Sequence, residues 1–421
     1  MLYDRWRQVV QARSREVAVV DLAEGQSLTF NELDGAAGRR PATAGLALPS
    51  GTTTGFVLTV LRAWRDDRPV CPLDRGQSLD RMPAVPTGVA HLKLTSATTG
   101  PPRLVAFTAQ QLAADADQIV AGMGLNAESP NLGVISLAHS YGFSNLVLPL
   151  LLHGIPLILG ESPLPEAIRR AAVNRPPLTL PAVPALWRSW HDADAIPANV
   201  RLAISAGAPL SVALEESVFR RQGLKIHNFY GATECGGIAY DATAIPRRGD
   251  GGVGTTLPGV RVGLDPDGCL EVRSPSVALG YVPPEPAHLG HGRYRSRDVA
   301  ELDEAGVRLL GRLGDLINLA GRKVAPETVE AVLATHPDVE ACLVFGAPDL
   351  RDVREERLVA VIAPRPRATV SESDLRAHAL RRLPAWQVPR EWRWVAAIPV
   401  NGRGKVSRLA WRQRYLAGDV A

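Results

Sequence analysis

The chain has 421 residues, of which 46% are hydrophobic, and a formal net charge of +4 from 47 Lys and Arg against 43 Asp and Glu. This length allows two or three domains with buried cores, and the near balance of charge gives no indication of a nucleic-acid or anionic-membrane surface. Only Lys93, Lys225, Lys323 and Lys405 are lysines, so a lysine placed in a loop is more informative here than in a lysine-rich protein.

The cysteines and the N-terminus indicate the compartment. Cys71, Cys235, Cys269 and Cys342 are far apart and form no Cys-x-x-Cys pair, which excludes a disulfide framework or a zinc site. The N-terminal residues are charged where a secretory signal is apolar, and the longest apolar run, 146–159, is interrupted by proline, histidine and glycine. We therefore expect a cytoplasmic protein without a membrane span.

Short apolar stretches alternate with segments of helical spacing through the first three quarters of the chain. The strand-like stretches are residues 134–137, 156–159, 178–181 and 202–205. This alternation predicts an α/β fold in which a large layered N-terminal domain has mostly parallel sheets. Ligands bind at the carboxyl ends of such strands.

After about Gly311 the pattern changes to that of a small α+β unit. It predicts helices over 326–335 and 372–383 and strands over 341–346 and 358–362. Gly311 and Gly314 lie among charged residues and permit backbone rotation. We therefore predict an N-terminal domain over 1–312 and a mobile C-terminal domain over 313–421.

A run of hydroxyl-bearing and small residues over 94–103 lies between an apolar strand and a helix, whose start is marked by Thr108 and Gln111 in capping-box spacing. Small side chains let backbone N–H groups approach an anion, the hydroxyls add donors, and Arg103 can form paired hydrogen bonds with phosphate oxygens. The run predicts a phosphate-binding loop, and a Ser/Thr-rich surface turn is the alternative.

The run over 228–234 brings an aromatic ring, a glycine, a hydroxyl and a carboxylate together. Tyr230 can stack on a base, and Glu234 can hold a magnesium ion that bridges phosphates. The alternative is a turn at a strand end with a solvated glutamate.

Lys405 lies in a glycine-flanked segment near the C-terminus. A lysine on such a loop can reach into a phosphate or carboxylate site from a distance. An ordinary hairpin turn explains the glycines equally well.

The order and spacing of these motifs resemble the adenylate-forming superfamily of acyl-CoA synthetases, peptide-synthetase adenylation domains and luciferases, from about Ser27 to Arg408. The resemblance implies ATP and Mg²⁺, with CoA possible as co-substrate. It implies nucleotide-binding roles for Thr95, Ser96, Ala97, Thr98, Thr99, Gly100, Arg103, Gly207, Ala208, Pro209, Asn228, Phe229, Tyr230, Gly231, Asp298 and Arg312. It implies catalytic roles for Lys405, Thr233, Glu234 and His139, with Glu234 as the metal ligand.

The chain departs from the family pattern at four positions. Ala97 and Arg297 stand where the family has glycine, and Arg103 and Asn318 stand where it has lysine. Arginine is not equivalent to lysine at a phosphate site, because its planar guanidinium sits further from the backbone. The segment 38–72 is also compressed, which predicts that part of the usual N-terminal subdomain is missing.

The segment 139–142 resembles the family's His-x-x-Gly element, whose histidine lies at the acyl pocket of acyl-CoA and aryl-CoA ligases. Adenylation domains that take α-amino acids have an aspartate in this neighbourhood, and none is present over 133–150. A buried ammonium group without a partner is costly, so we predict an apolar or aromatic acid. The predicted substrate residues are His139, Tyr141, Gly142, Phe143, Cys235 and Gly236, and a core histidine is the alternative for His139.

The predicted function is an AMP-forming ligase that adenylates such an acid with release of pyrophosphate and transfers it to a thiol, CoA. The alternatives are an amine or a carrier protein as acceptor, or a diazotase-like enzyme that activates nitrite for an aryl amine. A catalytically impaired nucleotide-binding scaffold is the alternative of another class. The expected partners are small molecules and no nucleic acid, and the sequence leaves the oligomeric state open.

Overall fold

The computed structural model describes residues 1–38, 45–79, 81–95, 103–285, 288–319, 322–348, 356–399 and 406–419. Its largest feature is a mixed sheet with the strand order β12-β13-β16-β17-β11-β10-β9-β8-β7-β5-β6-β1-β2. The parallel part of this sheet consists of β1 (Val17–Asp21), β5 (Asn131–Gly133), β6 (Leu157–Leu159), β7 (Leu178–Ala182), β8 (Val200–Ser205) and β9 (Ile226–Ala232).

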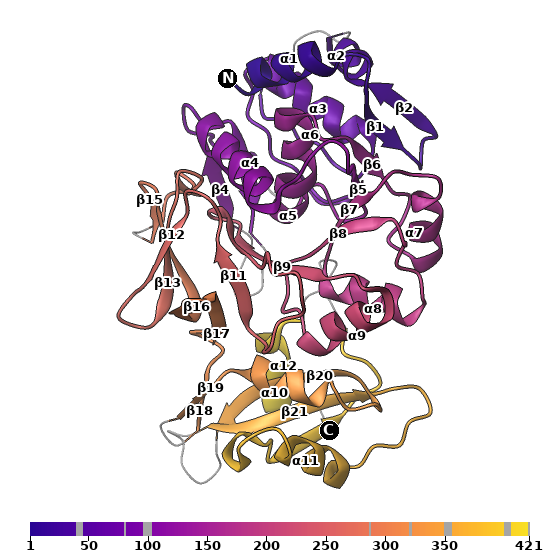
Figure 1. Cartoon of the computed structure of the whole chain (residues 1–421). Helices are drawn as coiled ribbons and strands as arrows, with labels where there is room; N and C mark the ends of the chain where they lie inside the picture. The colour runs from indigo at the N-terminus through magenta and orange to yellow at the C-terminus, as the bar shows by residue number, and fades with distance from the viewer. Residues whose placement is uncertain are drawn as a thin grey trace.

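Antiparallel strands extend the parallel part at both sides (Figure 1). They are β2 (Gln26–Thr29), β10 (Gly236–Tyr240), β11 (Gly252–Thr256), β12 (Arg261–Leu264), β13 (Cys269–Arg273), β15 (Leu289–Gly290), β16 (Arg293–Asp303) and β17 (Gly306–Arg312). A separate sheet of β3 (His91–Leu94), β4 (Leu104–Phe107) and β14 (Gly280–Val282) lies beside them, in the order β14-β4-β3.

Helices pack against these sheets and bury three apolar cores. They are α1 (Leu2–Arg13), α2 (Phe30–Gly38), α3 (Thr54–Arg65), α4 (Ala109–Met123), α5 (Ser140–Gly142), the π-helical turn η1 (Phe143–Val147), α6 (Leu148–His153), α7 (Pro165–Ala172), α8 (Pro184–Asp192) and α9 (Val212–Gln222). Every residue of β7 is buried, as expected of a strand in the middle of a parallel sheet. Within the described chain, no helix is both long enough and apolar enough to cross a membrane.

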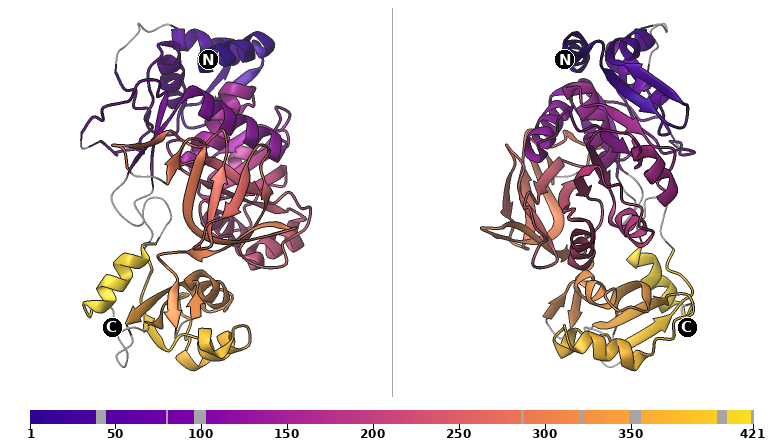
Figure 2. Two further views of the ribbon diagram at one scale, coloured as in Figure 1. Left: turned by 90° about the vertical axis from the view of Figure 1, so that its left-hand side faces the viewer. Right: turned by 45° about the vertical axis from the view of Figure 1, so that its right-hand side comes forward.

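The C-terminal unit has its own core and lies at one end of the molecule, after β17 (Figures 1 and 2). It contains the pair β18 (Ile317–Leu319) and β19 (Arg322–Val324), and a sheet in the order β20 (Val339–Pro348), β21 (Glu356–Pro364), β22 (Glu391–Trp394). Its helices are α10 (Pro326–Leu333), α11 (Glu372–Leu380), the 3₁₀ turn η2 (Ala385–Gln387) and α12 (Arg408–Leu416). The predicted fold class, a large α/β domain with a small α+β domain, is confirmed.

Two local predictions are wrong. The strand predicted over 134–137 is β5, which ends at Gly133, and in the run after it Ile135 and Ser136 line a cavity while Leu137 is buried in the core. The run over 94–103 joins β3 to β4 rather than a strand to a helix, because residues 104–107 pair with both β3 and β14. The helix α4 follows β4, and its predicted capping box between Thr108 and Gln111 is present.

Candidate active site

A cavity of about 180 Å³ opens at the carboxyl ends of the parallel strands, where ligands bind in open α/β sheets. The residues after β5, β7, β8 and β9 all contribute to its wall. Of the predicted site residues, His139, Tyr141, Gly142, Gly207, Phe229, Gly231, Thr233 and Gly236 line it.

Two predicted substrate residues lie elsewhere. Phe143 is fully buried, with its ring centroid 4.3 Å from that of His91 and 6.4 Å from that of Phe56. Cys235 is also fully buried, and burial raises the pKa of its thiol well above the ordinary value. The structure therefore does not bring either side chain to the cavity.

Three predicted nucleotide residues, from β9, β16 and β17 of the large sheet, meet beside the cavity. Tyr230 on β9 donates from its hydroxyl to Asp298 Oδ2 at 2.6 Å, and Arg312 Nε donates to Asp298 Oδ1 at 2.9 Å. Asp298 and Arg312 are direct partners in the pairing of β16 with β17. Burial and the Asp298 charge raise the pKa of Tyr230 well above its ordinary value, so its hydroxyl stays a donor. The arrangement presents a carboxylate that can accept hydrogen bonds from sugar hydroxyls.

The loop after β8 forms the next part of this side. Gly207 has φ +85°, which allows the chain to turn sharply away from the strand end, and Gly207, Ala208 and Pro209 are exposed. Asn228 on β9 is buried and donates to the backbone oxygen of Gly252 at 2.9 Å. Asn228 thus connects β9 to Gly252, the first residue of β11, near this loop.

Glu234 is buried, with 8% of its surface exposed, so the alternative of a solvated glutamate is wrong. Its Oε1 accepts a hydrogen bond from the Tyr281 hydroxyl at 2.9 Å. The guanidinium of Arg103 stacks over the Tyr281 ring at 4.2 Å and forms an ion pair with Glu285 at 2.8 Å. Tyr281, which the sequence did not single out, therefore joins the predicted metal ligand to the predicted phosphate-loop arginine.

Of the predicted phosphate loop, Thr95 and Arg103 are described, and they close its base. Thr95 N donates to Arg103 O at 2.9 Å, and Arg103 N donates to Thr95 Oγ1 at 2.9 Å. Ser96, Ala97, Thr98, Thr99, Gly100 and Lys405 lie outside the described residues. In the part of the chain that the structure describes, no group of three His, Cys, Asp or Glu side chains is placed to hold a metal ion.

His139 is 29% exposed and lines the cavity, so it is not a core histidine. Its Nε2 lies 3.4 Å from Asp74 Oδ2, and Ser136 Oγ donates to Asp74 Oδ1 at 2.7 Å. A carboxylate from a distant segment thus stands directly behind this wall, although the chain has none over 133–150.

A second carboxylate lies behind the cavity, in a buried group of Lys93, Asp115 and Ser144 that we name the Lys93 cluster. Lys93 Nζ lies 3.5 Å from Asp115 Oδ2, and both side chains are 2% exposed. Ser144 Oγ donates to Asp115 Oδ2 at 2.6 Å, Lys93 Nζ donates to Ser144 Oγ at 3.2 Å, and Gly237 N donates to Asp115 Oδ1 at 3.0 Å. Because Ser144 and Gly237 both line the cavity, Asp115 joins two of its walls.

The sequence contains two signals of the Lys93 cluster, one at Lys93 and one at Asp115. Lys93 interrupts an apolar strand, and Asp115 shares a helix face with the buried residues Leu112 and Ile119. Buried charges are paired, so each of these residues required a partner. Nothing in the spacing indicated that they pair with each other.

Comparison with known proteins agrees with this architecture. The AMP-binding enzyme family model matches residues 52–282, and the AMP-binding enzyme C-terminal domain model matches residues 328–405. The chain is 30% identical to the probable 2-succinylbenzoate–CoA ligase of Mycobacterium tuberculosis (strain CDC 1551 / Oshkosh), over 89% of this chain and 99% of that protein. It is 28% identical to the anthranilate–CoA ligase of Pseudomonas aeruginosa, over 96% of this chain and 81% of that protein.

The fold is similar to that of ATP-bound MatB from Rhodopseudomonas palustris, with a TM-score of 0.86 at 19% identity over 99% of each chain. The family models cover both units of the fold, and the Mycobacterium protein matches along nearly its whole length. The chain therefore belongs to the family of AMP-binding, adenylate-forming enzymes.

Proposed function

We propose that this chain is an AMP-forming ligase that activates an aromatic or apolar acid with ATP and transfers it to CoA. The observation that carries the proposal is the β9–β10 turn. From the end of β9 through this turn to the start of β10, Tyr230 contacts Asp298, Glu234 accepts from Tyr281, and Gly231, Thr233 and Gly236 line the cavity. A nucleotide held by Tyr230 and Asp298 would therefore lie next to an acid held in the cavity.

In the first half-reaction an oxygen of the acid attacks the α-phosphorus of ATP, and the bond from that phosphorus to the pyrophosphate oxygen breaks. The chain's part is to position the reactants and to stabilise the charge that develops. Asp298 and Arg312 would hold the ribose, the loop over 95–100 with Arg103 would hold the β- and γ-phosphates, and Lys405 would neutralise charge on the reacting oxygens.

Glu234 fits the role of magnesium ligand. A Mg²⁺ ion bound together with phosphates takes only one or two carboxylates from the protein. Glu234 offers one buried carboxylate close to Arg103 through Tyr281. When bound, the ion would supply charge neutralisation for the phosphates.

The cavity wall supports a flat or apolar acid. The rings of Tyr141 and Phe229 lie 6.0 Å apart, and Gly236 and Gly237 leave the facing wall without side chains. A Cβ at Gly236 would lie 2.1 Å from Asp115 Oδ1, so a larger residue does not fit there. Asp115, the carboxylate behind Gly236 and Gly237, is already paired with Lys93, which disfavours recognition of an α-ammonium group by that carboxylate. Both curated relatives described above are named as CoA ligases of aromatic acids.

For the second half-reaction we propose that the C-terminal domain, 313–421, turns relative to 1–312 at the connection between β17 and β18. Such a rotation would exchange Lys405 for the face that admits CoA. Gly311, with φ +141°, is the second-to-last residue of β17 and lies next to this connection.

The test is pyrophosphate release over a panel of benzoates, cinnamates, medium-chain fatty acids, α-amino acids and nitrite with an aryl amine, each with and without CoA. We expect turnover of an aromatic or apolar acid and formation of its CoA thioester. Lys405→Ala should lower pyrophosphate release by about 10²–10³-fold, the effect of removing one preorganised charge-stabilising group. Arg403→Ala, on the same segment, is the matched control.

Four outcomes would contradict the proposal. Robust turnover of an α-amino acid would overturn the pocket assignment, and turnover of nitrite alone would indicate the diazotase-like reaction. A chain that ATP stabilises but that turns over no acid would be the nucleotide-binding scaffold, and a chain that gains no thermal stability with ATP would lack the ATP site itself, because a ligand that binds the folded state stabilises it by RT ln(1 + [L]/Kd).

A further inference from the structure

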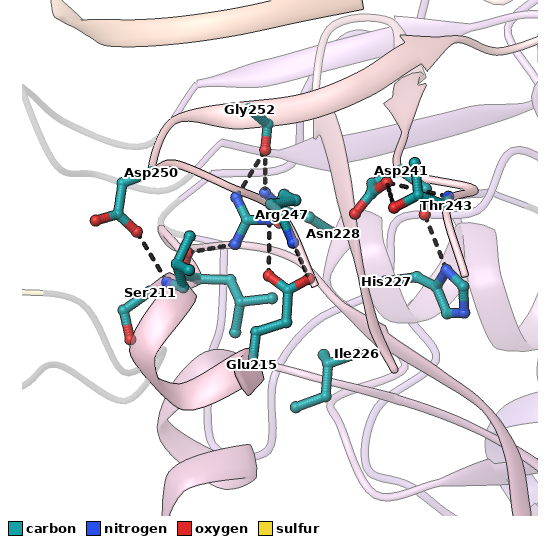
Figure 3. Close-up of polar contacts among 12 residues, drawn as sticks. Ser211, Glu215, Ile226, His227, Asn228, Asp241, Thr243, Arg247, Asp250 and Gly252 are labelled. Atoms are coloured by element: carbon teal, nitrogen blue, oxygen red, sulfur yellow. Dashed lines mark hydrogen bonds and ion pairs between the residues drawn. The ribbon is translucent and has the colours of Figure 1, made fainter. Parts of the chain in front are cut away.

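A second buried group of charges lies next to α9 and the start of β9, and Figure 3 shows three of its members, Glu215, Asp241 and Arg247. It consists of Glu215 on α9, Lys225, Asp241 and Arg247, which we name the Arg247 cluster. Lys225 is paired with both Glu215 and Asp241, and Arg247 with Glu215. The four side chains are each at most 8% exposed. Two cations and two anions balance, as required for charges removed from water.

Arg247 makes more contacts than this charge balance needs. Its Nε donates to Glu215 Oε2 at 2.8 Å, Nη1 donates to Gly252 O at 2.7 Å, and Nη2 donates to Leu210 O at 2.7 Å. Its backbone N also donates to Glu215 Oε1 at 3.0 Å. Glu215 thus fixes the plane of the guanidinium, and the two outer nitrogens bind backbone oxygens of two different segments.

Those two segments carry predicted nucleotide residues. Leu210 directly follows the exposed loop over 207–209, so the bond from Arg247 anchors the end of that loop. The Gly252 oxygen that accepts from Arg247 also accepts from Asn228 Nδ2 at 2.9 Å, which ties the guanidinium to β9 (Figure 3). Tyr230 follows Asn228 on the same strand. One side chain therefore sets the spacing between the loop and the strand that would enclose the nucleotide base.

A second hydrogen bond also connects the segment of Arg247 to the end of this loop. Asp250 Oδ1 accepts a hydrogen bond from Val212 N, at the first turn of α9, at 2.9 Å (Figure 3). The segment that carries Arg247 is thus fastened to the loop–helix junction at two points. We propose that Arg247 is a positioning residue of the nucleotide site, which holds the loop over 207–209 in register with β9 for ATP binding. This inference rests on the ATP site of the proposed function.

Arginine and lysine carry the same charge but donate hydrogen bonds with different geometry, and this difference separates a positioning role from charge balance. A guanidinium offers five N–H donors in one plane, whereas an ammonium group is a compact donor without that fixed geometry. Arg247→Lys keeps the charge beside Glu215 but cannot reach both backbone oxygens in their present directions. A role in charge balance alone tolerates this change, and a positioning role does not.

The experiment measures ATP affinity by titration calorimetry and the KM values for ATP and for the acid by pyrophosphate release. The variants are Arg247→Lys and Arg247→Ala, with Arg248→Ala, the exposed neighbour, as the control. We expect Arg247→Lys to remain folded, to weaken ATP binding at least tenfold and to leave the KM for the acid within about twofold of wild type. Arg248→Ala should match wild type in all three measurements.

A folded Arg247→Lys variant with wild-type ATP affinity overturns the proposal, and so does an equal rise of the two KM values. If Arg247→Ala does not fold, the ATP affinity of Arg247→Lys alone decides whether Arg247 is a positioning residue. The wild-type titration separates this inference from the proposed function. ATP binding without turnover of any acid would overturn the acid assignment and leave the affinity comparison valid, whereas absence of ATP binding would overturn both.

Discussion

The Lys93 cluster and the Arg247 cluster are two buried groups of charges that are balanced in different ways. The first has one cation and one anion, Lys93 and Asp115, completed by the Ser144 hydroxyl and the Gly237 N–H. The second distributes two cations and two anions over four side chains. When one member of a single ion pair is removed, the remaining charge has no other partner of opposite sign. In a network, the remaining charges keep some of their partners. The Lys93 cluster should therefore be the more sensitive of the two to loss of one charge.

The largest effect is expected for Lys93→Met. This change leaves Asp115 buried without the cation that pairs with it, and breaking a buried pair costs about 3–5 kcal/mol. Urea unfolding would measure the loss in the free energy of unfolding. Lys323→Met, on an exposed lysine of β19, is the control and should change it by less than about 0.5 kcal/mol. A loss of less than 1 kcal/mol for Lys93→Met would contradict the importance of the pair.

Lys225→Met tests the network in the same assay. Glu215 keeps Arg247 and Asp241 keeps its hydrogen bonds from Thr243, so the expected loss is smaller, about 1–3 kcal/mol. If Lys225→Met destabilises the protein as much as Lys93→Met does, the distinction between a single pair and a network is wrong.

A double-mutant cycle sharpens the comparison further. Lys93→Met combined with Asp115→Asn removes both charges, and the asparagine can still accept from Gly237 N. The double variant should recover part of the stability lost in Lys93→Met, with a coupling energy of about 0.5–3 kcal/mol. Additive losses in urea unfolding would mean that the two residues do not act as a pair.

The smallest effect is a pH dependence in the Arg247 cluster. Burial by itself raises the pKa of a carboxyl, but hydrogen bonds from Lys225 and Thr243 hold the pKa of Asp241 below its ordinary value. A lowered pKa in the folded state means that the ionised Asp241 stabilises the protein above the unfolded-state pKa, about 3.9, and that this stabilisation is lost as pH falls through the folded-state pKa.

The corresponding variant is Asp241→Asn, compared with wild type by urea unfolding from pH 7 downward. The difference in the free energy of unfolding should be constant above about pH 5 and should shrink below about pH 4. The exposed Asp419→Asn is the control for general charge effects. A difference that grows toward acid pH would show the opposite sign and contradict the assigned role of Asp241.

Local pattern was sufficient for much of the fold. The apolar runs at β6, β7 and β8 and the elements α10, β20, β21 and α11 lie where periodicity predicts them, because hydrophobic spacing and caps act over a few residues. The errors at β5 and β4 share one cause, which is that a short apolar run does not show by itself which structure it forms. The residues after Gly133 do not continue β5, and residues 104–107 form a strand where a helix was expected.

By itself the sequence determined where the short motifs lie, since residues 207–209 directly after the strand predicted over 202–205 and the run over 228–234 are each marked by residue types a few positions apart. Only the tertiary structure decided which side chains from distant parts of the chain contact the residues around the cavity. Asp74 meets Ser136, Lys93 meets Ser144, and Glu234 meets Tyr281, over separations of 62, 51 and 47 residues. The strand order, in which neighbours in space are distant in the chain, brings these side chains together, and no local spacing encodes that order.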